Sequence, residues 1–154
     1  MGLAMTCQDN EILLNNVLIQ MARSFLQYVA ECSPWVRIES AAIGEQVNVL
    51  AERQRQDVSE LVALLSAREH FIDFGSYPTE YTDQQFLALQ ALMSRLSSSQ
   101  GRIQNFMKTA IASLQANGDS QGADLLTVLE MHEADIQKAL SQIASELKSP
   151  AVQV

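Results

Sequence analysis

The scarcity of helix-breaking residues is the feature that most restricts the fold of this chain. Only three prolines, Pro34, Pro78 and Pro150, and six glycines interrupt 154 residues. Proline removes a backbone N–H donor and clashes with the preceding helical turn, so a chain with so few of them can keep long helices. Between the breaks, apolar residues recur at spacings of three and four, the period of a helix that buries one face. The sequence therefore predicts an all-α fold.

Four helices are predicted from the positions of these breaks. They span about residues 8–32, 34–68, 82–116 and 119–148, and they form one domain that covers 1–154. Short connections join antiparallel neighbours, whereas about thirteen residues separate the second helix from the third. Nearly extended, that crossover reaches ~40 Å and can return along a whole helix. An up-down-down-up four-helix bundle is the first prediction, and an up-down-up-down bundle is the second.

The long crossover is unusually aromatic. Phe71, Phe74, Tyr77 and Tyr81 lie within 69–81, a stretch with neither helical nor strand alternation. Aromatic rings remove large apolar areas from water when they are buried. We therefore expect this connection to pack against the helices.

Charge and composition restrict the function classes. The formal net charge is -8 and the ten Lys and Arg residues are dispersed, which disfavours binding to nucleic acid or to an anionic membrane surface. No run approaches the ~18 apolar residues that span a bilayer, and the first ten residues lack the pattern of a signal peptide. We expect a cytoplasmic protein. Only 18% of the residues are charged, and such a surface suits burial against copies of itself, so we also expect a homo-oligomer, a dimer or larger.

Polar residues interrupt the apolar stripes of three predicted helices near their midpoints. These residues are Gln54 and Asp57 in the second helix, Gln100 in the third and His132 in the last. The first helix does not join in, because its inward face stays apolar and Gln27 lies on the other side. Buried polar groups cost several kcal/mol unless they are paired. The four side chains therefore either form a satisfied network that fixes the helix register, or hold a metal or a small organic ligand.

The phase of the last helix decides which of its groups reach the centre. Its predicted inward stripe is Leu125, Leu129, His132, Ile136, Leu140, Ile143 and Leu147. On this phase Glu130 and Glu133 point elsewhere, and they enter a central site only if the phase differs.

With its long helices, its long crossover and its polar groups at mid-height, the chain resembles the ferritin-like superfamily. Residues 123–133 look like the last helix of ferritins, bacterioferritins and the DNA-protecting Dps proteins, which keep iron at this height. In that family two carboxylates and two Glu-x-x-His pairs converge on two metals. Here Leu129 stands three residues before His132, and the first helix offers no inward carboxylate. The resemblance therefore implies the fold, in a divergent member that lacks the usual di-iron ligands.

The expected function follows from the catalytic motifs that the sequence lacks. The chain has no Gly-rich phosphate loop, nucleophile elbow or HExxH sequence. We expect a non-enzymatic, oligomeric structural or interaction protein without a cofactor. The alternative is a divergent metal-binding protein, an iron-handling protein or an oxidase, in which His132, Asp135 and Asp57 hold iron or another divalent metal.

Overall fold

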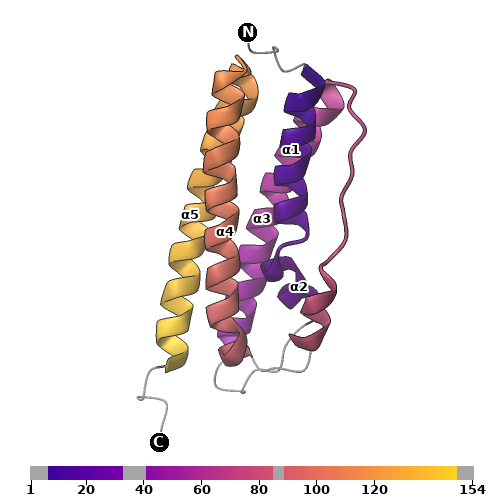
Figure 1. Ribbon diagram of the computed structural model, residues 1–154. Coiled ribbons are helices and arrows are strands. Elements are labelled where there is room, and N and C mark those ends of the chain that lie inside the picture. The colour runs from indigo at the N-terminus through magenta and orange to yellow at the C-terminus, as the bar shows by residue number, and fades with distance from the viewer. Residues whose placement is uncertain (1–6, 33–40, 85–88, 149–154) are drawn as a thin grey trace, which may run out of the picture.

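The computed structural model describes residues 7–32, 41–84 and 89–148, and all regular structure within these ranges is helical (Figure 1). The all-α prediction is confirmed. The helices are α1 (Cys7–Ala22), α2 (Phe25–Cys32), α3 (Ala41–Ala67), the short 3-10 helix η2 (Thr79–Gln84), α4 (Leu89–Ala116) and α5 (Ser120–Lys148). None of the described helices combines the length and the apolar composition that crossing a membrane requires.

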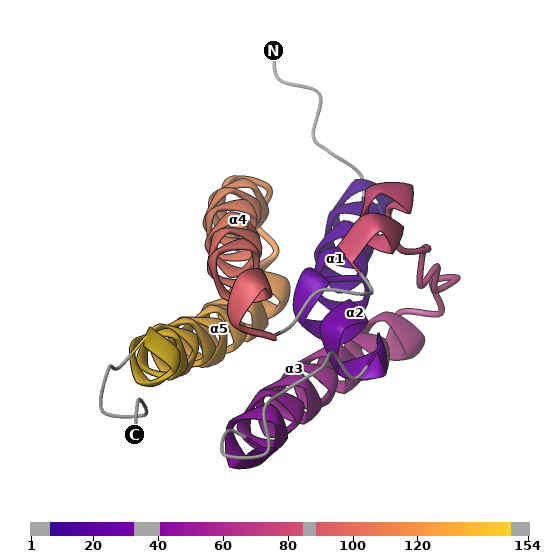
Figure 2. The same cartoon turned by 90° about the horizontal axis from the view of Figure 1, so that it is seen from below.

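The long helices lie side by side and each contacts two neighbours. α1 packs against α3 and α4, and α5 packs against α4 and α3. Seen from below, α4 and α5 form one pair, and α1 and α2 lie beside α3 (Figure 2). The connection after α3 runs back down the outside of the molecule to η2, so that α3 and α4 both rise from the same end (Figure 1).

The first predicted helix, 8–32, is wrong as one element, because it breaks at Arg23 and Ser24. Ser24 begins α2 as its N-cap, since its Oγ accepts a hydrogen bond from the backbone N–H of Gln27 at 3.2 Å. The backbone carbonyl of Ser24 then accepts from the N–H of Tyr28 at 3.1 Å. No proline or glycine marks this break.

The turn between α4 and α5 is an αL turn, at the boundary that the predicted helices 82–116 and 119–148 leave. α4 ends at Ala116, and Gly118 has a φ of 79°, which a residue with a Cβ adopts at a cost. Asp119 caps α5, because its Oδ1 accepts from the N–H of Gly122 at 2.9 Å. By contrast, the third helix does not start at 82: residues up to Gln84 belong to η2, and α4 begins at Leu89. Residues 85–88, and the predicted start of the second helix at 34, lie outside the described residues.

The aromatic rings of the crossover pack against the helices at one end only. Tyr77 and Tyr81 meet α2, where the ring centroids of Phe25 and Tyr81 are 5.0 Å apart and those of Tyr28 and Tyr77 are 5.3 Å apart. This second half therefore packs against the helices as expected, and its rings stack or meet edge to face.

In the first half of the crossover, the expectation that the aromatic residues pack against the helices is wrong. Phe71 is 83% exposed and Phe74 is 45% exposed. Backbone hydrogen bonds hold this half instead, since Asn15 donates to the carbonyl of Asp73 at 3.0 Å and accepts from its N–H at 3.0 Å. The rings are not needed for attachment and remain in solvent.

Two apolar cores lie one above the other between the helices. The upper core contains Leu14, Val17, Leu18, Met21, Val58, Leu61, Leu64, Leu65, Ile103, Met107, Ala110, Leu114, Ala123, Leu126 and Leu129. The lower core contains Phe25, Leu26, Tyr28, Val29, Val47, Leu50, Ala51, Leu92, Met93, Leu96, Ile136, Leu140 and Ile143. Between these two sets, the α1–α2 break and the helices α2, α3, α4 and α5 contribute buried polar side chains, which together form the candidate site.

Candidate functional site: a polar layer between two apolar cores

The centre of the molecule holds a layer of five buried polar side chains, which we call the polar layer. Its members come from the α1–α2 break, α2, α3, α4 and α5. They are Ser24, Gln27, Gln54, Gln100 and Glu133, each no more than 3% exposed. Because burying a polar group without a partner costs free energy, the hydrogen bonds within the layer decide whether it stabilises the fold.

Gln54 is the hub of the polar layer. Its Oε1 accepts from Oγ of Ser24 at 2.6 Å and from Nε2 of Gln27 at 3.0 Å. Its Nε2 donates to Oε1 of Glu133 at 3.2 Å and to Oε1 of Gln100 at 3.4 Å. Both lone pairs and both N–H groups of this amide are therefore used, which ties α2, α3, α4 and α5 together at one height.

Glu133 is the only ionisable member of the polar layer. Gln100 donates from Nε2 to its Oε2 at 2.7 Å and to its backbone carbonyl at 3.1 Å. Together with the bond from Gln54, each carboxylate oxygen of Glu133 thus accepts an amide N–H. Such an arrangement suits a carboxylate, which can only accept.

A chain of amides links this buried carboxylate to a cation at the surface. Nε of Arg55 donates to Oε1 of Gln27 at 2.9 Å, Gln27 donates to Gln54, and Gln54 donates to Glu133. Every donor in this series points toward the carboxylate, so the amide dipoles align and strengthen one another. Arg55 is itself held by Glu52, 2.6 Å away.

Burial and hydrogen bonding shift the pKa of Glu133 in opposite directions. Removal from water raises the pKa of this carboxyl to about 7, from an ordinary value of 4.5. The bonds from Gln100 and Gln54 act in the opposite direction, and the nearby carboxylate of Asp57 adds to the increase. The group therefore changes charge near neutral pH, inside a protein core.

Beside the polar layer, Asp57 and His132 form a pair between α3 and α5. Nδ1 of His132 lies 2.8 Å from Oδ1 of Asp57. Asp57 is 4% exposed. Burial raises the pKa of Asp57, against the influence of His132. The pair faces an open groove of about 340 Å³, which Arg53 and Asp135 also line.

The structure corrects the predicted phase of α5. The side chain of His132 is 53% exposed, whereas Glu133 is fully buried in the place predicted for it. Leu125 is likewise only half-buried and Leu126 takes its inward position. Spacings of three and four residues fit Leu129, Glu133 and Ile136 as well as they fit Leu129, His132 and Ile136, so periodicity alone does not separate them.

The structure also corrects the prediction that the first helix stays out of the centre. Gln27 is buried and donates from Nε2 to the carbonyl of Ala51 at 2.8 Å, besides its bond to Gln54. The break at Ser24 starts a new helix with a new phase, which turns Gln27 inward. The predicted residues Gln54, Asp57 and Gln100 are buried as expected.

The candidate metal ligands are only partly brought together. Asp57 and His132 are in contact, and the exposed Asp135 lines the same groove. In residues 7–32, 41–84 and 89–148, no three or more His, Cys, Asp and Glu side chains gather in a way that could hold a metal ion. Oδ2 of Asp57 is nevertheless buried without a hydrogen-bond partner in that part of the chain.

The described fold and polar layer define an all-helical protein with an amide-bound carboxyl at its centre. Comparison with family models, with curated proteins and with solved structures finds no match. The function is therefore argued from the geometry of the polar layer and of the surface.

Proposed function

We propose that this chain is a divergent ferritin-like four-helix bundle with up-down-down-up topology. The common direction of α3 and α4, joined by a connection that runs the length of the helices, supports this topology (Figure 1). The ring of contacts in which each long helix touches two neighbours supports the bundle. The α1–α2 pair takes the place of the first helix.

The proposed function is that of a non-enzymatic, oligomeric structural or interaction protein of the cytoplasm. The observation that carries it is the closure of the polar layer, since the amide hydrogens of Gln54, Gln27 and Gln100 are used by partners within the protein. A layer that is satisfied internally fixes the register of the helices, as buried polar networks do elsewhere. Such a rigid scaffold suits the presentation of a surface.

The surface offered to another copy lies on α5. Val128 and Met131, one helical turn apart, are 49% and 62% exposed. On the neighbouring α3, Val49 is 56% exposed. Large apolar side chains in solvent, on a chain with few charges, favour burial against a second copy whose surface has the same composition.

Sedimentation velocity over a range of concentrations tests this proposal. We expect the wild type to sediment as a dimer or a larger homo-oligomer. The double substitution Val128→Lys and Met131→Lys should shift it to the monomer, because each lysine places a hydrated charge in the interface. The matched control is Ser141→Lys with Gln142→Lys, at exposed positions of the same helix, and it should leave the assembly intact. A wild type that stays monomeric at every concentration contradicts the proposal.

The second candidate function is metal binding, with iron or another divalent ion held by Asp57 and His132 and completed by Asp135 or by a second subunit. The orphaned Oδ2 of Asp57, beside an imidazole and an open groove, favours it. Carboxylate oxygens and imidazole nitrogens suit zinc, manganese and iron. The ion would supply Lewis-acid or redox chemistry at the groove.

Elemental analysis of protein purified without chelators separates the two candidates. Metal binding predicts stoichiometric iron, manganese or zinc that His132→Ala removes. The control is His70→Ala, because His70 lies after the end of α3, away from the groove. Wild-type protein that contains no such metal, and that binds none when it is titrated with zinc, contradicts metal binding and leaves the structural role.

A further inference from the structure

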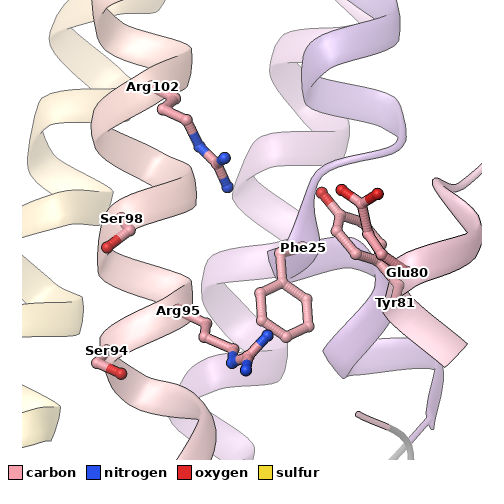
Figure 3. Close-up of a pocket in the computed structure, with 7 residues that line it drawn as sticks. All are labelled: Phe25, Glu80, Tyr81, Ser94, Arg95, Ser98 and Arg102. Carbon is pink, nitrogen blue, oxygen red and sulfur yellow. The ribbon is translucent and has the colours of Figure 1, made fainter. Parts of the chain in front are cut away.

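A cavity of about 380 Å³ lies between α4 and the aromatic end of the crossover (Figure 3). α4 contributes Ser94, Arg95, Ser98 and Arg102 to one wall, and Phe25 lies on the other. The volume falls in the range of ordinary small-ligand sites. The polar layer and its hydrogen bonds do not involve these α4 side chains.

Two positively charged side chains, Arg95 and Arg102, line this cavity. Arg95 and Arg102 lie two helical turns apart, so both extend from one face of α4 toward the opposite wall (Figure 3). Among the side chains that the structure describes, which do not include that of Asp83, neither guanidinium forms an ion pair within 4.0 Å. Glu80 contributes the single carboxylate among the described lining residues. In a chain whose net charge is -8, this cavity is locally cationic.

The opposite wall of the cavity is aromatic and rigid. The rings of Phe25 and Tyr81 stack with centroids 5.0 Å apart and an interplanar angle of 27°. Phe25 is 3% exposed, so its position is fixed by the lower core. A flat ring of a ligand can therefore rest on the partly exposed ring of Tyr81, which already stacks on the buried Phe25, without ordering a flexible side chain first, which favours binding.

A second cavity of about 240 Å³ adjoins the first and shares Glu80, Tyr81 and Arg102 with it. It continues toward the α1–α2 break, where Arg23 lines it. Nε of Arg23 donates to the carbonyls of Phe74 and Gly75, each at 3.2 Å, which anchors the crossover over this end. Arg102 thus stands at the junction of the two spaces, within reach of a ligand in either.

We propose that this cavity, which we call the arginine cleft, binds a small organic anion that joins a flat apolar ring to a carboxylate, phosphate or sulfonate group. The ring lies against Tyr81, which Phe25 supports, and the anionic group takes the guanidinium N–H donors of Arg95 and Arg102. Arginine favours such groups because its planar donors match a pair of anionic oxygens. The hydroxyls of Ser94 and Ser98 offer further donors at the same wall. This role is independent of the oligomeric function and of the Asp57–His132 pair.

Anilinonaphthalene sulfonate is a suitable probe, because it joins a flat ring system to one anion and fluoresces when it leaves water. Its neutral counterpart is phenylnaphthylamine, which has the same rings without the sulfonate. We expect the anionic probe to bind the folded wild type with one site per chain and an affinity that falls as salt is added. Inorganic phosphate, which lacks the ring, should bind at least about tenfold more weakly, a difference of about 1.4 kcal/mol.

Substitutions distinguish binding of the probe in the arginine cleft from binding to other surfaces. Arg95→Gln with Arg102→Gln should weaken binding of the anionic probe by about tenfold or more and leave binding of the neutral probe unchanged, since only the anionic probe uses the charged guanidinium donors. The control is Arg53→Gln with Lys108→Gln, which removes the same charge from exposed positions outside the cleft. Both pairs replace exposed side chains, and equal thermal midpoints for the three proteins will show that folding is preserved.

The binding site is located by amide chemical shifts of the wild type titrated with the anionic probe. Shifts concentrated around residues 79–81 and 94–102 are expected. Equal affinity of the anionic probe for all three proteins overturns the proposal, as does equal affinity of the wild type for the charged and uncharged ring systems. Shifts confined to the α3–α5 groove or to the Val128 surface overturn it too, because they place the anion elsewhere.

Discussion

Replacing the buried carboxyl, Glu133→Gln, should make the protein more stable at neutral and alkaline pH. The pKa of Glu133 is about 7 in the folded protein and 4.5 in a solvated chain. Below pH 4.5 the group is neutral in both states. As the pH rises through 7, the folded protein must hold a charge in its core, so stability that is present below 4.5 is lost through the folded pKa. A glutamine amide has nearly the same shape and never ionises.

The size of the effect follows from the two pKa values. Each pH unit between them corresponds to about 1.4 kcal/mol, so the wild type loses about 3 kcal/mol between about pH 4.5 and a pH above 7. Full burial of Glu133 means that solvent does not screen this term. The variant should therefore match the wild type within about 1 kcal/mol at low pH and exceed it by about 3 kcal/mol at high pH.

Urea unfolding followed by circular dichroism, at fixed protein concentration and at several pH values, measures this difference. Fixed concentration matters because assembly adds to apparent stability. Asp57 and His132 are present in both proteins, so their own titration largely cancels in the comparison. Glu146→Gln, at an exposed position of the same helix, is the matched control and should show no such divergence. Parallel pH curves for the wild type and Glu133→Gln would refute the reasoning.

The remaining predictions concern two glycines and the ion pair between Arg68 and Asp119. Gly75→Ala should lower the free energy of unfolding by more than about 1 kcal/mol, because Gly75 has a φ of 67° and a Cβ would lie 2.8 Å from Cγ2 of Ile19. Gly101→Ala should instead stabilise the protein by about 0.5–1 kcal/mol, because Gly101 lies in the middle of α4 with open space around it. Urea unfolding of both variants checks this contrast. Arg68→Ala should cost about 1–3 kcal/mol at neutral pH, because two guanidinium nitrogens contact Asp119 at 2.7 and 2.8 Å. Arg68 holds the pKa of Asp119 below its usual value, so this stabilisation is lost as the pH falls through that pKa, and a gap between variant and wild type that stays constant in acid would contradict it.

The sequence predicted α4 well because nothing in its pattern competes with the helical period. Apolar residues recur along it at spacings of three and four, and the structure buries Met93, Leu96, Ile103, Met107, Ala110 and Leu114 together with Gln100 at the polar interruption. The helix also ends at Ala116, before Asn117 and Gly118, where an αL turn satisfies the last carbonyls. Where apolar spacing and turn chemistry agree, both the fold and one site residue could be predicted.

The α1–α2 break could not be predicted in the same way. Its cause is a serine, Ser24, whose side chain accepts a backbone N–H in competition with a continuous helix. Serine is common inside helices too, so its presence does not mark a break. The tertiary partner that decides the matter is Gln54, which receives the Ser24 hydroxyl only when the chain turns there. A contact between residues so far apart in the sequence leaves no local signal.

The choice between His132 and Glu133 at the centre shows how a site can be decided by its neighbours. Judged alone, a carboxyl is the poorer candidate for burial, because its charged form loses more solvation than a neutral imidazole does. The opposite helices reverse this preference, since Gln54 and Gln100 aim three N–H groups at this position of α5 and a carboxylate accepts them all through its side chain and backbone. An imidazole has at most one acceptor nitrogen for the two N–H groups that the carboxylate accepts, so it would leave one of them unpaired, at about 1–3 kcal/mol. His132 is then free to face the groove and bind Asp57. The amides on α3 and α4 therefore select the phase of α5, and with it the one buried group of the polar layer that can change its charge.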